Sequence, residues 1–124
     1  MKLSPKEFDK TVNKALAGIP DEIRRHLDNV VISVRKRPSR EMLEQMELLP
    51  GEEPLGFYWG DSLLDRSIFS PLNYPDTIFI FQGPLEEICE TPGELEEQIR
   101  ITVVHEIAHF FGISEDRLEE LGYG

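Results

Sequence analysis

The chain has 124 residues, enough for one domain with a single hydrophobic core, and we expect residues 1–124 to form that domain. It carries 13 Lys and Arg against 24 Asp and Glu, a formal net charge of −11, so we expect neither nucleic acid nor an anionic membrane as a partner. The single Cys89 cannot form an internal disulfide, no apolar run is long enough to span a membrane, and the first residues lack the hydrophobic core of a signal peptide, so we expect a cytoplasmic protein.

The first half of the chain predicts three helices and two strands. Ser4 and Glu7 form a capping box around Pro5, which is a favoured first residue of a helix. Apolar residues at helical spacing and β-branched or aromatic runs predict the elements themselves. These are a helix from Pro5 to near Gly18, a short helix from Pro20, a strand over residues 30–34, a short helix after Ser39 and a strand over residues 55–59.

The second half predicts one more strand and three helices. Thr91 and Glu94 form a second capping box, which begins a long helix. The elements are a strand over residues 77–81, a short helix over residues 84–89, the long helix after Thr91 and a last helix over residues 115–121. The loop from Gly60 to Pro75 either borders a functional cleft or only connects two strands.

This order of elements predicts an α+β domain. A small sheet of three strands, or more, packs on the long helix, and short helices flank it. Residues 77–81 form the last predicted strand before the long helix. We therefore expect this strand to form the edge of the sheet beside the cleft.

The long helix carries the sequence His105-Glu106-x-x-His109, which has the spacing of a zinc-binding helix. Residues four apart lie above one another on the same face of an α-helix, so both imidazoles can bind one ion. Glu106 lies about 100° around the helix, where its carboxylate can take a proton from a water that the ion activates. The motif predicts two metal ligands and a general base.

Apolar residues surround this motif on nearly every side of the helix: Ile99, Ile101, Val103, Val104, Ile107, Ala108, Phe110 and Phe111. A helix that is apolar all round is buried, and polar groups inside it need partners or a metal ion. The simpler alternative is that the histidines bond to neighbouring groups and the glutamate pairs with an arginine. The positions of all three residues around the helix favour a metal site.

A catalytic zinc ion needs a third protein ligand and an open fourth position. Gly112 suits a left-handed residue that ends the helix and turns the chain back. Glu115 then occupies the last ligand position of the longer zincin motif, and Asp116 is the alternative. We expect one Zn²⁺ ion, although the order of metal affinities also allows another divalent metal.

The segment from His105 to Tyr123 resembles the minimal zincins, a family of small bacterial proteins grouped as metallopeptidases, and residues 76–85 resemble them more loosely. The ligand after the glycine is typically Asp in that family, so Glu115 adds one methylene at the matching position. The resemblance implies a compact minimal zincin-like α+β fold and a zinc-peptidase-like site. It also implies that an extended peptide is held against the edge strand, here residues 77–81, by main-chain hydrogen bonds. It does not supply a substrate.

Two functions are consistent with these features. The first is a zinc-dependent peptidase that acts on a peptide or protein with Glu106 as general base, and the second is a non-catalytic zincin-like binding module with a structural metal. The net charge and the lack of a further His downstream argue against an RNA hydrolase. Tyr74 and Tyr123 are candidates for a second oxyanion donor. Neither composition nor motif indicates an oligomeric state.

Two other features have no assigned role. His26 is expected to be a surface or half-buried histidine, because no coordination partner is near it in the sequence. The basic cluster of Arg35, Lys36, Arg37 and Arg40 is expected to be a solvated loop.

Overall fold

In the computed structural model, three strands of the described residues form one sheet, in the order β1-β3-β2. The structure describes residues 1–46, 48, 51–60 and 76–123. Strand β1 (Val30–Arg35) runs parallel to β3 (Asp76–Phe81), and β2 (Gly56–Trp59) pairs with β3 in the antiparallel direction. The predicted α+β class with a small sheet and flanking helices is confirmed.

The sheet order corrects one prediction. Residues 77–81 were expected to form the edge strand, but β3 lies in the centre, paired with β1 on one side and β2 on the other. Its side chains Ile78 and Ile80 are fully buried, as a central strand requires. The strand next to the long helix is β2, and the helix reaches it through contacts at Gly56 and Tyr58.

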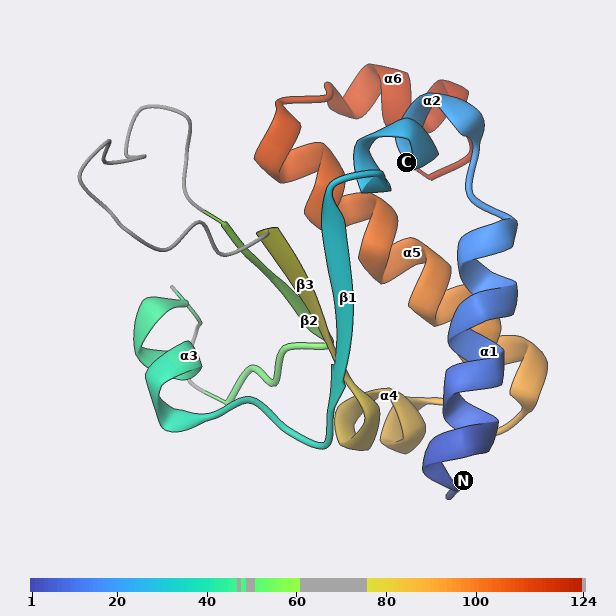
Figure 1. The fold of residues 1–124 in the computed structure, drawn as a ribbon, viewed down its shortest axis with the longest axis vertical. Coiled ribbons are helices and arrows are strands. Elements are labelled where there is room, and N and C mark those ends of the chain that lie inside the picture. Colours follow the sequence, from blue (N-terminus) through green and yellow to red (C-terminus); the bar gives the residue numbers. More distant parts are fainter. Residues whose placement is uncertain (47, 49–50, 61–75, 124) are drawn as a thin grey trace.

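Helices make up most of the remaining described structure (Figure 1). They are α1 (Pro5–Ala17), α2 (Asp21–Arg24) with the 3₁₀ helix η1 (Arg25–Leu27), α3 (Arg40–Gln45), α4 (Gln82–Ile88), α5 (Pro92–Phe111) and α6 (Glu115–Glu120). Figure 1 shows α1 and α5 side by side on one side of the sheet, with α3 on the other side. Most of the predicted segment between Gly60 and Pro75 lies outside the described residues.

The hydrophobic core lies between the sheet and the helices α1 and α5. Burial of a large aliphatic or aromatic side chain contributes about 1.5–3 kcal/mol, so this layer supplies most of the stabilisation. Fully buried residues in this layer include Phe8 and Ala15 of α1, Ile78 and Ile80 of β3, and Leu95, Ile99, Val103, Val104 and Ile107 of α5.

The two ends of α5 follow from local sequence signals. The Thr91 hydroxyl accepts a hydrogen bond from the Glu94 amide at 3.1 Å, which satisfies one of the first four amides of the helix. At the other end Gly112 adopts φ = 70°, the left-handed conformation predicted for it. Only one side of α5 is fully buried, and Phe111 is 42% exposed, so the expectation of a helix buried all round was wrong.

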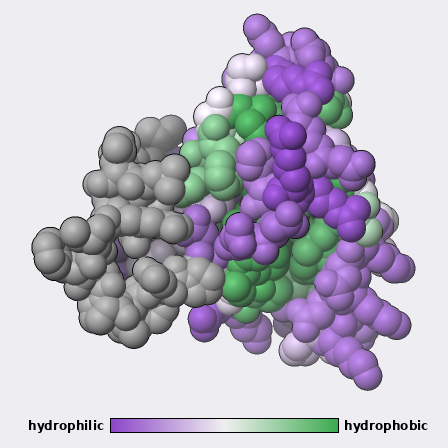
Figure 2. Space-filling view, turned by 45° about the horizontal axis from the view of Figure 1, so that its top comes forward, coloured by the Kyte–Doolittle hydropathy of each residue, from purple (hydrophilic) through white to green (hydrophobic). Residues whose placement is uncertain are grey.

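The outer surface agrees with the acidic composition. Figure 2 shows a mainly hydrophilic face with a hydrophobic area near its middle. Within the described ranges, no helix combines the length and the hydropathy that a membrane crossing requires.

Strand β2 approaches α5 closely because residue 56 is a glycine. A Cβ at Gly56 would lie 2.6 Å from Cγ2 of Thr102 and 3.0 Å from the carbonyl oxygen of Phe79. The first contact lies on α5 and the second on β3, so a side chain at this position has no room on either side. The absence of a side chain therefore brings the strand against the helix.

We predict that Gly56→Ala lowers the free energy of unfolding by about 1–3 kcal/mol, because the added methyl overpacks the contact between β2 and α5. Urea denaturation monitored by far-ultraviolet circular dichroism measures the change. Gly93→Ala is the control, since its Cβ would meet only the Thr91 hydroxyl oxygen at 4.0 Å. Thr102→Ser removes the opposing methyl and should restore part of the loss. Equal stability of Gly56→Ala and the parent chain would contradict the prediction.

Candidate functional site

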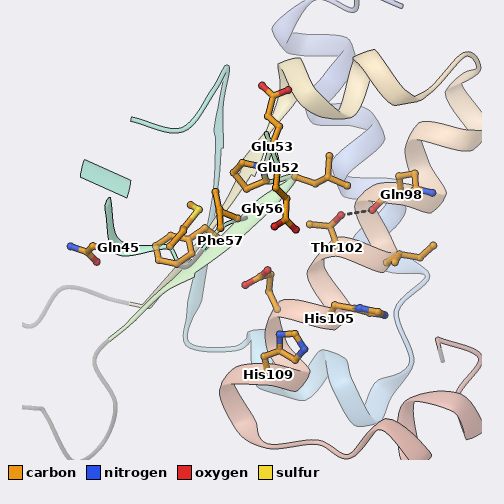
Figure 3. A pocket seen from close by; sticks show the side chains of 15 residues that line it. Gln45, Glu52, Glu53, Gly56, Phe57, Gln98, Thr102, His105 and His109 are labelled. Carbon is orange, nitrogen blue, oxygen red and sulfur yellow. Dashed lines mark hydrogen bonds between the residues drawn. The ribbon is translucent and has the colours of Figure 1, made fainter. Parts of the chain in front are cut away.

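The helix α5 positions the three motif residues. His105 and His109 lie one turn apart on the helix, and Glu106 follows His105 directly (Figure 3). His105 and Glu106 are half-buried, whereas His109 is exposed. The motif therefore lies at the boundary between the core and solvent rather than inside the core.

The motif residues line a cleft of about 700 Å³ between α5 and the chain that leads into β2 (Figure 3). One wall consists of α5 residues, and the other consists of the segment 52–57 with the end of α3. The lining includes three carboxylates, of Glu52, Glu53 and Glu106, and both motif histidines. The described lining contains no Lys or Arg.

Glu106 is held against the backbone of β2. Its Oε2 accepts a hydrogen bond from the Tyr58 amide at 3.1 Å. Burial raises the pKa of the Glu106 carboxyl above its usual value, while the Tyr58 hydrogen bond and the two motif histidines act in the opposite direction. A carboxylate with a raised pKa in a cleft is suited to accept and return a proton.

Tyr58 is itself fixed by contacts on both sides of its ring. The ring stacks on Phe110 with centroids 4.0 Å apart and meets Phe111 edge-on at 6.1 Å. Its hydroxyl donates to Oδ2 of Asp76 at 2.7 Å. The amide that orients Glu106 therefore belongs to a residue anchored to both α5 and β3.

The outer edge of β2 faces α5 and the cleft. Leu55 O accepts a hydrogen bond from Phe81 N at 3.0 Å. In an antiparallel ladder the backbone N–H and C=O groups of successive residues point alternately toward the partner strand and away from it. The backbone groups of Phe57 therefore point toward β3, and those of Gly56 and Tyr58 point away from it. The bond from the Tyr58 amide to Glu106 agrees with this alternation. The strand whose backbone borders the cleft is thus β2.

His105 contacts a backbone group that the sequence did not indicate. Its Nε2 lies 3.0 Å from the carbonyl oxygen of Tyr123. A carbonyl only accepts hydrogen bonds, so Nε2 must carry the proton in this contact. Figure 3 shows the His105 ring pointing away from His109.

The phenol of Tyr123, an oxyanion candidate, interacts with Arg100. Burial raises its pKa, and the positive charge and hydrogen bond of Arg100 partly offset that rise. The backbone carbonyl of Tyr123 contacts His105 of the motif. Tyr74, the other candidate, lies outside the described residues.

The two candidate third ligands lie on α6. Glu115 and Asp116 are exposed in its first turn, after the Ser114 cap. Arg117 fixes this helix through two hydrogen bonds, of 2.7 and 2.6 Å, to the carboxylate of Glu22. The structure brings neither acid to the histidines.

The donor types fit a zinc ion, since two imidazoles on one helix face and nearby carboxylates are groups that zinc binds. Their present arrangement is not yet a complete ligand set. In the part of the chain that the structure describes, no three His, Cys, Asp or Glu side chains are grouped closely enough to hold a metal.

Residues without a predicted role also have clear positions. His26 stacks on Phe111 with centroids 4.3 Å apart and is half-buried. Arg37 of the basic cluster pairs with Glu53 on the cleft wall and with Glu87 on α4. Gly56 and Tyr58 were missed as site residues. A glycine at the start of an aromatic strand is the only sequence signal that pointed to them.

We predict that Glu106→Gln raises the melting temperature of the metal-free protein, because the amide keeps an acceptor for Tyr58 and removes a buried charge. Because the pKa of the Glu106 carboxyl is raised in the folded state, the folded parent chain binds more protons than the unfolded chain. The free energy of unfolding of the parent chain therefore falls as pH rises. The difference in melting temperature between the variant and the parent chain should therefore grow from about pH 4 to pH 7. Calorimetry in the presence of a chelator measures it, and an advantage that shrinks with rising pH would contradict the assigned burial.

Comparison with known proteins bears on the fold and the family of the chain. The chain is similar in fold to a conserved hypothetical protein from Thermo thermophilus, with a TM-score of 0.52 and 19% sequence identity over 96% of this chain and 97% of that chain. A search of the curated proteins finds no match. The family model described as zincin-like metallopeptidase matches residues 27–124, which include every described strand, the helices α3 to α6 and the whole motif. The chain therefore belongs to the zincin-like metallopeptidase family.

Proposed function

We propose that this protein is a zinc-dependent metallopeptidase that hydrolyses peptide bonds. The observation that carries the proposal is the position of Glu106, a half-buried carboxylate with a raised pKa, fixed by a backbone amide and next in sequence to a candidate metal ligand. His105, His109 and Glu115 would hold the ion, with Asp116 as the alternative third ligand. A zinc ion supplies a Lewis acid that lowers the pKa of a water to near 7 and polarises a carbonyl.

Glu106 would act as the general base and then as the general acid. It takes the proton from the attacking water and passes it to the nitrogen of the leaving amine. The bond to the Tyr58 amide keeps one carboxylate oxygen in place, so that the other can face the cleft. Burial raises the pKa of this carboxyl, which makes it a better proton acceptor than a solvated glutamate.

The substrate would lie in the cleft beside β2. An extended peptide can add to a strand edge through main-chain hydrogen bonds. Glu106 already accepts from the Tyr58 amide, so the peptide would lie along residues 52–56, which lead into β2. The cleft wall formed by residues 52–57 then contacts side chains of the substrate. This assigns to the segment that leads into β2 the role that the sequence had suggested for residues 77–81.

The second candidate is a non-catalytic zincin-like module with a structural metal. It requires Glu115 and Asp116, which are adjacent on α6, both to bind the ion, because four protein ligands leave no open position. Zinc binding without cleavage of any member of a peptide library would support this candidate over the peptidase.

We predict that Glu106→Gln retains zinc and lowers the rate of peptide cleavage by about 10²–10⁴-fold, since glutamine cannot accept the proton. Metal analysis of the purified variant and a peptide-library assay measure the two properties. Glu97→Gln is the matched control, because Glu97 is exposed on the same helix and pairs with Arg100 away from the cleft. An unchanged rate in Glu106→Gln would rule out its role as the base.

We predict that Glu115→Ala weakens zinc binding by at least about tenfold, whereas Asp116→Ala leaves the affinity near that of the parent chain. Competition with a chromophoric chelator measures both affinities. The two residues are adjacent and exposed, so loss of either charge weakens the long-range attraction of the zinc ion equally. Each variant therefore serves as the control for the other. The reverse pattern would transfer the ligand role to Asp116.

A further inference from the structure

We propose that the carbonyl oxygen of Tyr123 competes with the metal for Nε2 of His105, so that the turn after α6 determines how readily the site takes up zinc. The inference rests on the proposed zinc site and adds a positioning residue to it. Its basis is the contact of 3.0 Å between these two atoms.

One nitrogen cannot serve both partners. The carbonyl can only accept, so the His105 Nε2 bonded to it carries a proton. A nitrogen that binds a metal must instead offer its lone pair, and metal binding therefore displaces a proton from that atom. The Tyr123 contact and metal binding through Nε2 exclude each other.

The direction of the ring leads to the same conclusion. Residues four apart on a helix are separated by a rise of about 6 Å, while the bonds from zinc to imidazole nitrogens are about 2.0–2.1 Å long. The distal nitrogens of His105 and His109 must therefore converge to bind one ion. The His105 ring points away from His109 (Figure 3), so it has to turn and leave the Tyr123 carbonyl.

The carbonyl is held in place by an ordered turn. Gly122 has φ = 92°, its amide donates to Glu119 O at 3.0 Å, and the Tyr123 amide donates to Leu118 O at 2.7 Å. Leu118 is buried in the core, and Arg117 ties the same helix to Glu22. Because α6 is anchored on both faces, the Tyr123 carbonyl stays in place when the His105 ring turns, and the hydrogen bond between them breaks.

Gly122 offers a way to weaken this acceptor without a steric clash. No heavy atom lies within 4 Å of a Cβ built at Gly122, so Gly122→Ala strains only the left-handed backbone. Gly51 is the matched control, because it has φ = 82° and also has no atom within 4 Å of its Cβ position.

The experiment measures zinc affinity of the full chain by competition with a chromophoric chelator. We expect Gly122→Ala to bind zinc about two- to tenfold more tightly than the parent chain, because zinc binding to this variant no longer has to break the hydrogen bond between His105 and the Tyr123 carbonyl. Gly51→Ala should bind zinc as tightly as the parent chain. Equal or weaker binding in Gly122→Ala would overturn the proposal, because it would mean that the carbonyl has no influence on His105 or supports it as a ligand.

A second measurement does not depend on the variant. Long-range ¹H–¹⁵N spectra of the histidine rings should show His105 protonated at Nε2 in the zinc-free protein and unprotonated there after zinc is added. Protonation at Nδ1 without zinc, or a proton retained at Nε2 with zinc bound, would overturn the proposal. If no variant binds zinc, the proposed function fails as well. If all bind it equally, only the competition fails.

Discussion

The approach of β2 to α5 is the contact on which the whole site depends. It is possible because Gly56 has no side chain to collide with Thr102. Two residues further along, the same approach brings the Tyr58 amide to 3.1 Å from the Glu106 carboxylate. One packing contact therefore orients the candidate base, buries it and raises its pKa. The catalytic chemistry proposed for this protein follows from how closely a strand can lie against a helix.

Local signals in the sequence were sufficient for α5 and its motif. Thr91 caps the helix, Gly112 ends it in the left-handed conformation, and the motif histidines lie one turn apart as their spacing requires. Each of these features depends on residues within a few positions of one another. The predicted class of fold was correct for a similar reason, because element types follow from short-range periodicity.

Long-range features were not predictable in the same way. The central position of β3 depends on which strands meet, and residues 77–81 carry no sign of it beyond continuous hydrophobicity. The groups that contact His105 and Glu106 are the backbone carbonyl of Tyr123 and the backbone amide of Tyr58. Every residue has such groups, so residue type cannot reveal them. The exposure of Glu115 likewise depends on how α6 is anchored through Arg117.

The order of the strands also has a consequence for how the chain reaches its native state. Strand β3 follows both of its partners in sequence and lies between them, so among the described strands β1 and β2 have no partner until residues 76–81 have left the ribosome. The parallel pairing joins Val30 to Asp76, a contact between distant parts of the chain that slows the search for native structure. Helix α5 follows later still. We therefore expect the sheet to assemble late in synthesis, after its central strand has emerged.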